Sequence, residues 1–156
     1  MRIKTLLIAN RGEIAQRIIR ACRELGVETV AVYSQADADS LHLRMAYETI
    51  CIGPAASDKS YLDIPSIISA AEIADVEAIH PGYGFLSENA VFAQNVIDAG
   101  MVWSGPPPGA ITSMGDKIEA RQTMDAADVP VVPGTLEPLT SAEEALRVAR
   151  EIGVPV

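Results

Sequence analysis

The residue types best suited to chemistry lie in the stretch His80–Asn89, which reads His-Pro-Gly-Tyr-Gly-Phe-Leu-Ser-Glu-Asn. The three residues that end at His80 have the pattern of a short buried strand, and Pro81 favours extended geometry just before it, so the strand can end there. Gly82 and Gly84 allow positive φ or close backbone approach and would hold the ring of Tyr83 at the carboxyl end of the strand. Ligands of open α/β sheets bind beyond this end. The stretch therefore predicts either the mouth of a binding site or a tight strand-to-helix turn covered by an aromatic ring.

The two ends of this loop need structural support. Ser87 is a good N-cap for a helix that continues to about Ala99, and Glu88 in its first turn suits the positive end of the helix dipole. We therefore expect His80 and Glu88 to support the loop, the former as the last strand residue and the latter at the start of the helix. The other histidine, His42, is predicted to be a surface residue of a short helix. Two histidines are too few for a His-rich metal site.

Composition narrows the function classes. The 156 residues carry a net charge of -9, with 49% hydrophobic and 21% charged residues, which is typical of a soluble globular protein with one main domain. A negative chain lacks the clustered cations that bind nucleic acid without regard to sequence. The first ten residues hold too short an apolar run for a signal peptide or membrane span, so we expect a cytoplasmic protein. Cys22 and Cys51 fall in apolar patterns and are predicted to be reduced core thiols.

Strand-like and helix-like segments alternate along the chain, and this order positions the candidate residues. Strands are predicted at 5–9, 29–33, 49–52, 78–80 and 101–103, and helices at 13–25, 41–47, after Asp63, at 87–99, after Asp116 and after Ser141 as far as Ile152. Alternation of this kind predicts an α/β fold with a doubly wound parallel sheet. The turn after the first strand lacks the G-x-G-x-x-G dinucleotide fingerprint, and no phosphate-binding P-loop occurs.

The proline-marked link Val129–Gly134 is the candidate domain boundary. We expect residues 1–130 to form the α/β domain, and residues 131–156 to hold a linker, a helix and the start of a strand belonging to a next domain. Ser141 and Glu144 would form a capping box for that helix.

The first predicted helix has two different faces. Ile14, Ile18 and Leu25 lie on the face expected to be buried. Arg17, Arg20 and Glu24 share the opposite side. A charged stripe of this kind usually faces solvent, and the sequence pattern alone favours a solvent-exposed face here.

Four strings together resemble the amino-terminal part of biotin carboxylase. They are Ile8–Ala15, which reads Ile-Ala-Asn-Arg-Gly-Glu-Ile-Ala, then Ala78–Asn89, Met114–Lys117 and Val132–Gly134, in the order and at the spacings of that family. The resemblance covers essentially all 156 residues. Two departures from the usual family pattern hinder assignment to a subfamily: Tyr47 in place of the common Asp, and Trp103-Ser104 in place of a more aliphatic pair.

The resemblance implies a Rossmann-like domain preceding an ATP-grasp domain, and roles for particular residues. Lys117 would contact ATP, and Tyr83 with Gly82 and Gly84 would form a wall of the biotin site. The stripe on the first helix, Arg17, Arg20 and Glu24, would belong to a homodimer interface.

The resemblance also implies ATP, Mg²⁺ and biotin as cofactors or carried substrates, with a biotin carboxyl carrier and a carboxyltransferase as partners. The second ATP lysine, the lid, the Mg²⁺ ligands and the groups that act on bicarbonate would follow Val156. We therefore expect no catalytic residue in this chain, and no turnover by it alone. The acceptor stays open between acyl-CoA esters and pyruvate. Another ATP-grasp ligase and a non-catalytic interaction domain are the remaining alternatives.

Overall fold

The computed structural model describes residues 2–132, 135, 137 and 139–153. The chain divides into two compact units, Met1–Ile111 and Thr112–Val156. The division falls within helix α4 (Pro108–Gly115), which the sequence analysis did not predict because its first residues belong to a proline-rich connection.

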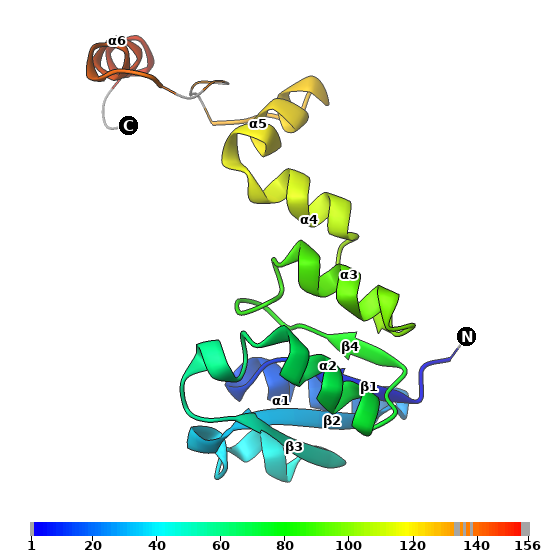
Figure 1. Ribbon diagram of the computed structural model, residues 1–156. Coiled ribbons are helices and arrows are strands. Elements are labelled where there is room, and N and C mark those ends of the chain that lie inside the picture. Colours follow the sequence, from blue (N-terminus) through cyan, green and yellow to red (C-terminus); the bar gives the residue numbers. More distant parts are fainter. Residues whose placement is uncertain (1, 133–134, 136, 138, 154–156) are drawn as a thin grey trace. The chain divides into compact units, whose positions relative to one another are not determined.

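The first unit is a parallel sheet with helices between its strands (Figure 1). Its five strands lie in the order β3-β2-β1-β4-β5, and every neighbouring pair is parallel. The predicted α/β fold with a doubly wound sheet is confirmed, and each predicted strand end is placed within one residue. The elements are β1 (Thr5–Ile8), α1 (Gly12–Leu25), β2 (Glu28–Ser34), η1 (Gln35–Asp37), η2 (Leu41–Arg44), β3 (Glu48–Gly53), η3 (Ser57–Lys59), α2 (Ile64–Ile73), β4 (Ala78–His80), α3 (Ala90–Asp98) and β5 (Val102–Trp103).

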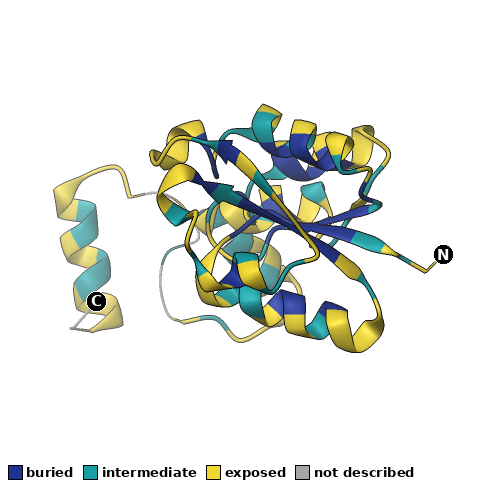
Figure 2. Cartoon of the chain, turned by 90° about the horizontal axis from the view of Figure 1, so that it is seen from below, coloured by how far each residue is buried: buried dark blue, intermediate teal, exposed yellow. Residues whose placement is uncertain are grey.

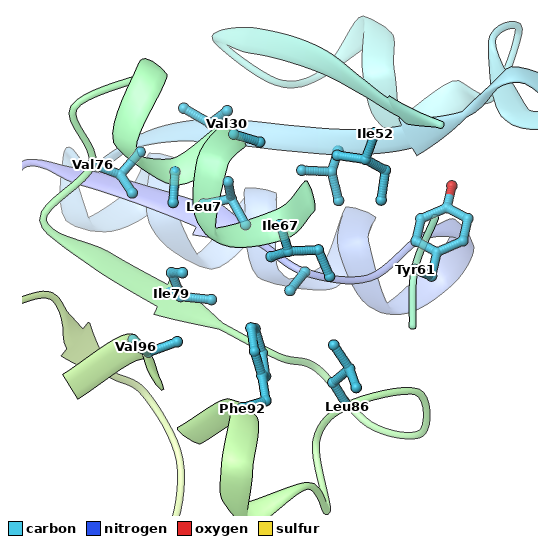
Figure 3. Packing of buried hydrophobic residues seen from close by; sticks show 14 residues of the cluster. Leu7, Val30, Ile52, Tyr61, Ile67, Val76, Ile79, Leu86, Phe92 and Val96 are labelled. Carbon is cyan, nitrogen blue, oxygen red and sulfur yellow. The ribbon is translucent and has the colours of Figure 1, made fainter. Parts of the chain in front are cut away.

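The sheet is covered on both faces, because side chains alternate along its central strand. Leu6 and Ile8 pack with the buried side of α1, while Leu7 and Ala9 belong to the larger cluster with α2 and α3. Figure 2 shows buried strands between helices whose outer sides are exposed. In Figure 3, Tyr61 lies at one end of the larger cluster with its hydroxyl oxygen directed away from Ile67.

The strand order places a topological switch point at β1. The chain passes from β1 to β2 and β3 on one side, and then crosses to β4 and β5 on the other. Ile8 pairs with His80, and the N–H of Ala9 donates to the carbonyl of His80 at 2.9 Å. The segments that follow β1 and β4 therefore leave the sheet side by side, at the point where open α/β sheets bind ligands.

Helix α3 begins later than predicted. Asn89, not Ser87, is its N-cap, since the Asn89 side chain accepts a hydrogen bond from the N–H of Phe92 at 2.9 Å. Successive turns occupy the intervening residues, with the N–H of Ser87 bonded to the carbonyl of Gly84, and these turns bring Leu86 into the core. Glu88 consequently precedes the helix and is exposed.

Three other predictions about burial were wrong. His42 was predicted to lie at the surface but is fully buried, because the short 3-10 helix η2 packs against α1. Leu25 is 66% exposed, since it is the last residue of α1. Cys51 is exposed on the edge strand β3, where its neighbour Ile52 takes the inward position. Both cysteines are free.

The described part of the second unit contains α5 (Lys117–Ala126) and α6 (Ala142–Ile152). Asp116 caps α5 by accepting from the N–H groups of the second and third helical residues, both at 2.9 Å. Ser141 caps α6 by accepting from the N–H of Glu144 at 3.1 Å, as predicted. The carboxylate of Glu144 bonds to Thr140 rather than completing a capping box with Ser141.

The predicted strand start at 154–156 lies outside the described residues. The boundary predicted near residue 130 falls inside the second unit and stays a prediction. In the part of the chain that the structure describes, no helix combines the length and apolar character needed to cross a membrane.

Candidate functional site

The candidate site lies where β1 and β4 end, and a buried asparagine connects the two segments. Asn10 is 3% exposed, and its Nδ2 donates to the carbonyl oxygens of Pro81 and Tyr83, both at 2.8 Å. Its Oδ1 accepts from the N–H of Arg11 at 2.9 Å. All three hydrogen bonds bind the side chain to backbone, so Asn10 fixes the path of the loop after β4.

His80 and the two glycines shape that loop. The Nδ1 of His80 accepts from the N–H of Gly82 at 3.0 Å, and burial lowers the pKa of His80, so the neutral ring can serve as an acceptor. Gly82 has φ +68, and a Cβ there would lie 2.8 Å from Nδ2 of Asn10. Gly84 has φ +65 but no atom within 4 Å of such a Cβ. Only Gly82 is therefore required both for its φ and for close approach.

Tyr83 presents its ring to solvent between these glycines. The side chain is exposed, and its hydroxyl donates to Oε2 of Glu13, in the first turn of α1, at 3.2 Å. Among the hydrogen bonds of the described residues, none uses the N–H of Tyr83 or of Gly84. The loop thus offers a ring face and two backbone donors at the carboxyl edge of the sheet.

A charged network lies beside the loop and centres on Asp37. Arg11 forms an ion pair with Asp37 at 3.1 Å, and the hydroxyl of Tyr61 donates to the same carboxylate at 2.8 Å. The Oγ of Ser34 donates to it at 3.1 Å, while the N–H of Ser34 donates to the hydroxyl of Tyr61 at 3.0 Å. These contacts bind the end of β1 to the end of β2.

The guanidinium of Arg11 also covers two aromatic rings. Its central carbon lies 5.5 Å from the ring centre of Tyr61 and 5.8 Å from that of Phe85, and the two rings stack at 5.0 Å with an interplanar angle of 19°. Cations are attracted to aromatic faces within about 6 Å. Phe85 has φ +44, an uncommon conformation for a side chain of its size, which the stack holds in place.

The network shifts the pKa values of Asp37 and Tyr61. Burial alone would raise the pKa of Asp37, but hydrogen bonds from Tyr61, Arg11 and Ser34, together with the charge of Arg11, outweigh burial and lower it. Burial, with the nearby Asp37 carboxylate, raises the pKa of Tyr61 to about 12. At neutral pH the carboxylate is therefore charged and the phenol keeps its proton.

The remaining predicted residues are exposed on helices. Lys117 is exposed at the first position of α5, in the second unit. Arg17, Arg20 and Glu24 are exposed along α1. Within the described residues, no group of three or more His, Cys, Asp or Glu side chains is arranged to hold a metal ion.

The site depends on residues that the sequence analysis did not single out. Asn10, Arg11 and Asp37 had no assigned role, although polar residues directly after buried strands mark the carboxyl edge of a parallel sheet. The sequence pattern did not indicate Tyr61, because this residue lies in the turn between η3 and α2 and not at the end of a strand.

The fold defines an α/β domain with a topological switch point at β1, and the loop after β4 lies at the edge where such domains bind ligands. Residues 2–111 match the biotin carboxylase N-terminal domain, and residues 116–156 match the carbamoyl-phosphate synthase L chain ATP binding domain. The chain belongs to the biotin carboxylase N-terminal domain family.

Individual relatives agree with this assignment. "Biotin carboxylase 1" of Bacillus subtilis is 58% identical over 99% of the chain. The structure of a Campylobacter jejuni biotin carboxylase complexed with β,γ-ATP has a TM-score of 0.91 at 51% identity and covers 98% of the chain. The biotin carboxylase domain dimer of Hydrogenobacter thermophilus 2-oxoglutarate carboxylase, with MgADP, ADP and bicarbonate, has a TM-score of 0.91 at 46% identity over 99% of the chain. In each case the chain spans 34% of the relative.

Proposed function

We propose that this chain is the amino-terminal third of a biotin carboxylase, a ligase that uses ATP and bicarbonate to carboxylate biotin on a carrier protein or domain. The observation that carries the proposal is the 58% identity to a biotin carboxylase over 99% of the chain. The remaining catalytic groups would lie in the two thirds of the relatives that the chain does not match. The isolated chain is accordingly inactive.

The biotin site would use the loop after β4 as one wall. Tyr83 supplies an exposed ring, and a Cβ at Gly84 would meet no atom within 4 Å, so the backbone there is open to a ligand. Gly82 would belong to the wall as the residue that lets the loop pass close to Asn10. His80 supports the loop through its bond to Gly82, whereas Glu88 is exposed and takes part in none of the hydrogen bonds among the described residues. The expectation for Glu88 came from a place in the first helical turn, and Glu88 precedes α3, so its support of the loop stays a prediction.

ATP would be held in part by Lys117. An exposed ammonium group suits a phosphate as a point charge, and no ion pair among the described residues uses it. Bound Mg²⁺ supplies neutralisation of phosphate charge in such reactions, and its ligands would come from the part of the enzyme beyond this chain. This chain's own contribution is a cation for phosphate and a wall for biotin.

The partners would be the rest of the enzyme, the biotin carboxyl carrier, a carboxyltransferase and a second copy of the subunit. The dimer named for the Hydrogenobacter structure supports the last of these. The compartment would be the cytoplasm. The domain arrangement would be an α/β domain over residues 1–130, followed by a linker and the start of the ATP-grasp domain.

A second candidate differs only in the acceptor of the carboxyl group. The Hydrogenobacter relative belongs to a 2-oxoglutarate carboxylase, so a keto-acid acceptor stands beside acyl-CoA esters. The acceptor is chosen by a different domain or subunit, and the first reaction is the same for both.

A chimaera tests the proposal. This chain would replace the matching third of the Bacillus subtilis enzyme, and ATP cleavage would be measured with and without biotin and bicarbonate. We expect cleavage that requires both, with the native enzyme and the 156-residue chain as positive and negative controls. A folded chimaera that cleaves no ATP under these conditions would favour the non-catalytic alternative. Activity with an amino donor in place of biotin would favour another ATP-grasp ligase.

A further inference from the structure

We propose that the segment Asn10–Glu13, which joins the end of β1 to the first turn of α1, positions Tyr83. We call it the positioning segment. It contacts the loop after β4 at three places: the backbone around Gly82, the ring of Phe85 and the hydroxyl of Tyr83 itself. The inference rests on the proposed function, because it treats Tyr83 as the wall of a ligand site, and it adds the residues that hold that wall in place.

The first contact is the amide of Asn10. One Nδ2 group satisfies the carbonyls of Pro81 and Tyr83, which therefore must turn toward the end of β1. The side chain is 3% exposed, so water cannot readily replace either bond. Gly82 passes so close that a Cβ would contact Nδ2 at 2.8 Å. The loop entrance is thus fixed in one conformation.

The second contact is the guanidinium of Arg11 on Phe85. Arg11 is itself held by Asp37, which also receives hydrogen bonds from Tyr61 and Ser34. Phe85 stacks on Tyr61, a residue that is 1% exposed in the core. The loop exit is therefore fastened to β2 and to the core, even though Phe85 has a positive φ that its side chain would normally avoid.

The third contact sets the direction of the ring. Tyr83 lies between the two fastened points, and its hydroxyl donates to Glu13 in the first turn of α1. This hydrogen bond is exposed and weaker than the first two contacts. The hydrogen bond between Tyr83 and Glu13 favours one orientation of the ring, whereas a loop with two glycines would otherwise allow several.

The combined effect is preorganisation. A loop held at entrance and exit loses little freedom when a ligand binds to its exposed ring, and less binding free energy is lost in ordering it. Loosening the positioning segment should therefore weaken binding at Tyr83 and leave the phosphate contact assigned to Lys117 unaffected. A purely structural role for Asn10 would instead affect both ligands through overall stability.

Asn10→Asp isolates the first contact. The variant keeps the shape of the side chain and the oxygen that accepts from Arg11, but it replaces the donor with an oxygen facing two carbonyls. In the 156-residue chain we expect chymotrypsin to cut after Tyr83 or Phe85 roughly tenfold faster, because cleavage tracks the population of the open loop. Cleavage after the exposed Tyr47 should stay unchanged and serves as the internal standard.

Two comparisons keep this assay falsifiable. Asn95→Ala changes an exposed asparagine of α3 and should cut at the wild-type rate everywhere. Faster cutting after the buried Tyr61 and Phe92 would reveal general unfolding, in which case Arg11→Lys, which keeps the charge but loses the planar stack, replaces Asn10→Asp in the assay. Wild-type rates after Tyr83 and Phe85 in a folded variant would overturn the inference.

The same variants in the complete enzyme that carries this chain give the functional result. We expect the KM for free biotin to rise about tenfold in Asn10→Asp, with the KM for ATP within about twofold of wild type. An unchanged biotin KM, or an equal rise for ATP, would contradict positioning through Tyr83. Failure of the proposed function would look different, because the wild-type enzyme would then lack biotin-dependent activity while the cleavage assay still reported on the loop.

Discussion

Asp37 is the residue on which the contacts at the carboxyl edge converge. Arg11, Tyr61 and Ser34 all donate to its carboxylate, so its charged form is favoured in the folded chain and not in the unfolded one. These contacts lower the pKa of Asp37 more than burial raises it. A group whose pKa is lower in the folded state stabilises the fold above its unfolded pKa, and this contribution is lost as the pH falls through the folded value.

The replacement Asp37→Asn should therefore destabilise the chain in a pH-dependent way. At pH 7 we expect a loss of about 1–3 kcal/mol, because the donors lose a charged acceptor. The difference between wild type and variant should hold as the pH is lowered and then shrink below the ordinary value of 3.8, where the wild-type carboxylate also becomes neutral. Urea unfolding followed by circular dichroism between about pH 7 and pH 3 measures the difference.

Asp63→Asn is the matched control, since this carboxylate caps α2 outside the network. Its effect should not depend on the Arg11 and Tyr61 contacts. Equal stability of wild type and Asp37→Asn at pH 7, or a difference that persists undiminished at pH 3, would show that the charge of Asp37 does not stabilise the fold.

At the residue scale, the sequence predicted the backbone correctly where glycine or proline limits its conformation. Gly82 and Gly84 do adopt positive φ, and the strand ends at His80 as Pro81 suggested. It did not find Asn10, because an asparagine after a strand is equally compatible with an ordinary turn. Its two partners lie 71 and 73 positions away, and only the strand order brings them together.

At the element scale, the sequence pattern identified the five strands and helices α1, α2 and α3, because the central strands of a doubly covered sheet are almost wholly apolar. The failures occurred at ends and in short turns, where apolar spacing carries little information. Ser87 and Asn89 are both good N-cap residues, and the choice between them depends on the turns that bury Leu86. The 3-10 turn that buries His42 is likewise fixed by packing against α1 rather than by its own sequence.

The position of the α3 cap can be tested with two alanine variants. Asn89→Ala removes the acceptor for the N–H of Phe92 and should cost about 1 kcal/mol of unfolding free energy. Ser87→Ala leaves that bond intact and should change stability by less than about 0.5 kcal/mol. Urea unfolding of both variants gives the comparison. A larger loss for Ser87→Ala would mean that the helix begins where its sequence first suggested.

At the scale of the whole molecule, the chain corresponds to one third of the length of its relatives, and each of its two units carries one of the proposed ligand contacts. The first unit would offer Tyr83 to biotin, and the second would offer Lys117 to ATP. Each is therefore best tested in the complete enzyme, with a readout specific to its own ligand.

Lys117→Ala should affect ATP and not biotin. Hydrogen bonds to charged groups contribute about 1.5–3 kcal/mol, so we expect the KM for ATP to rise roughly 10- to 100-fold, with a lower kcat if the contact strengthens during phosphoryl transfer. Lys59→Ala removes an exposed lysine of the first unit and is the matched control. Steady-state kinetics with ATP and biotin varied separately would measure both constants. Unchanged constants for ATP would identify Lys117 as a surface residue.

The outer face of α1 carries the proposed contact between two copies of the subunit. Arg17, Arg20 and Glu24 are exposed and follow one another at helical spacings of three and four residues, which places them on one side of the helix. A two-fold interface brings the same surface of both subunits together, so an arginine of one can meet a glutamate of the other twice. The charged stripe is therefore suited to self-association despite its net exposure in the single chain.

Reversing the charge of Arg20 should then weaken the dimer. Arg20→Glu would place like charges together twice, and we expect the dissociation free energy of the complete enzyme to fall by a few kcal/mol at most, less so at high salt where the repulsion is screened. Lys59→Glu makes the same change of charge outside α1 and should leave the dimer intact. Sedimentation velocity of both variants at several salt concentrations distinguishes the two cases. If Arg20→Glu dimerises as tightly as wild type at low salt, where repulsion is greatest, the stripe faces solvent and the subunits meet through another surface.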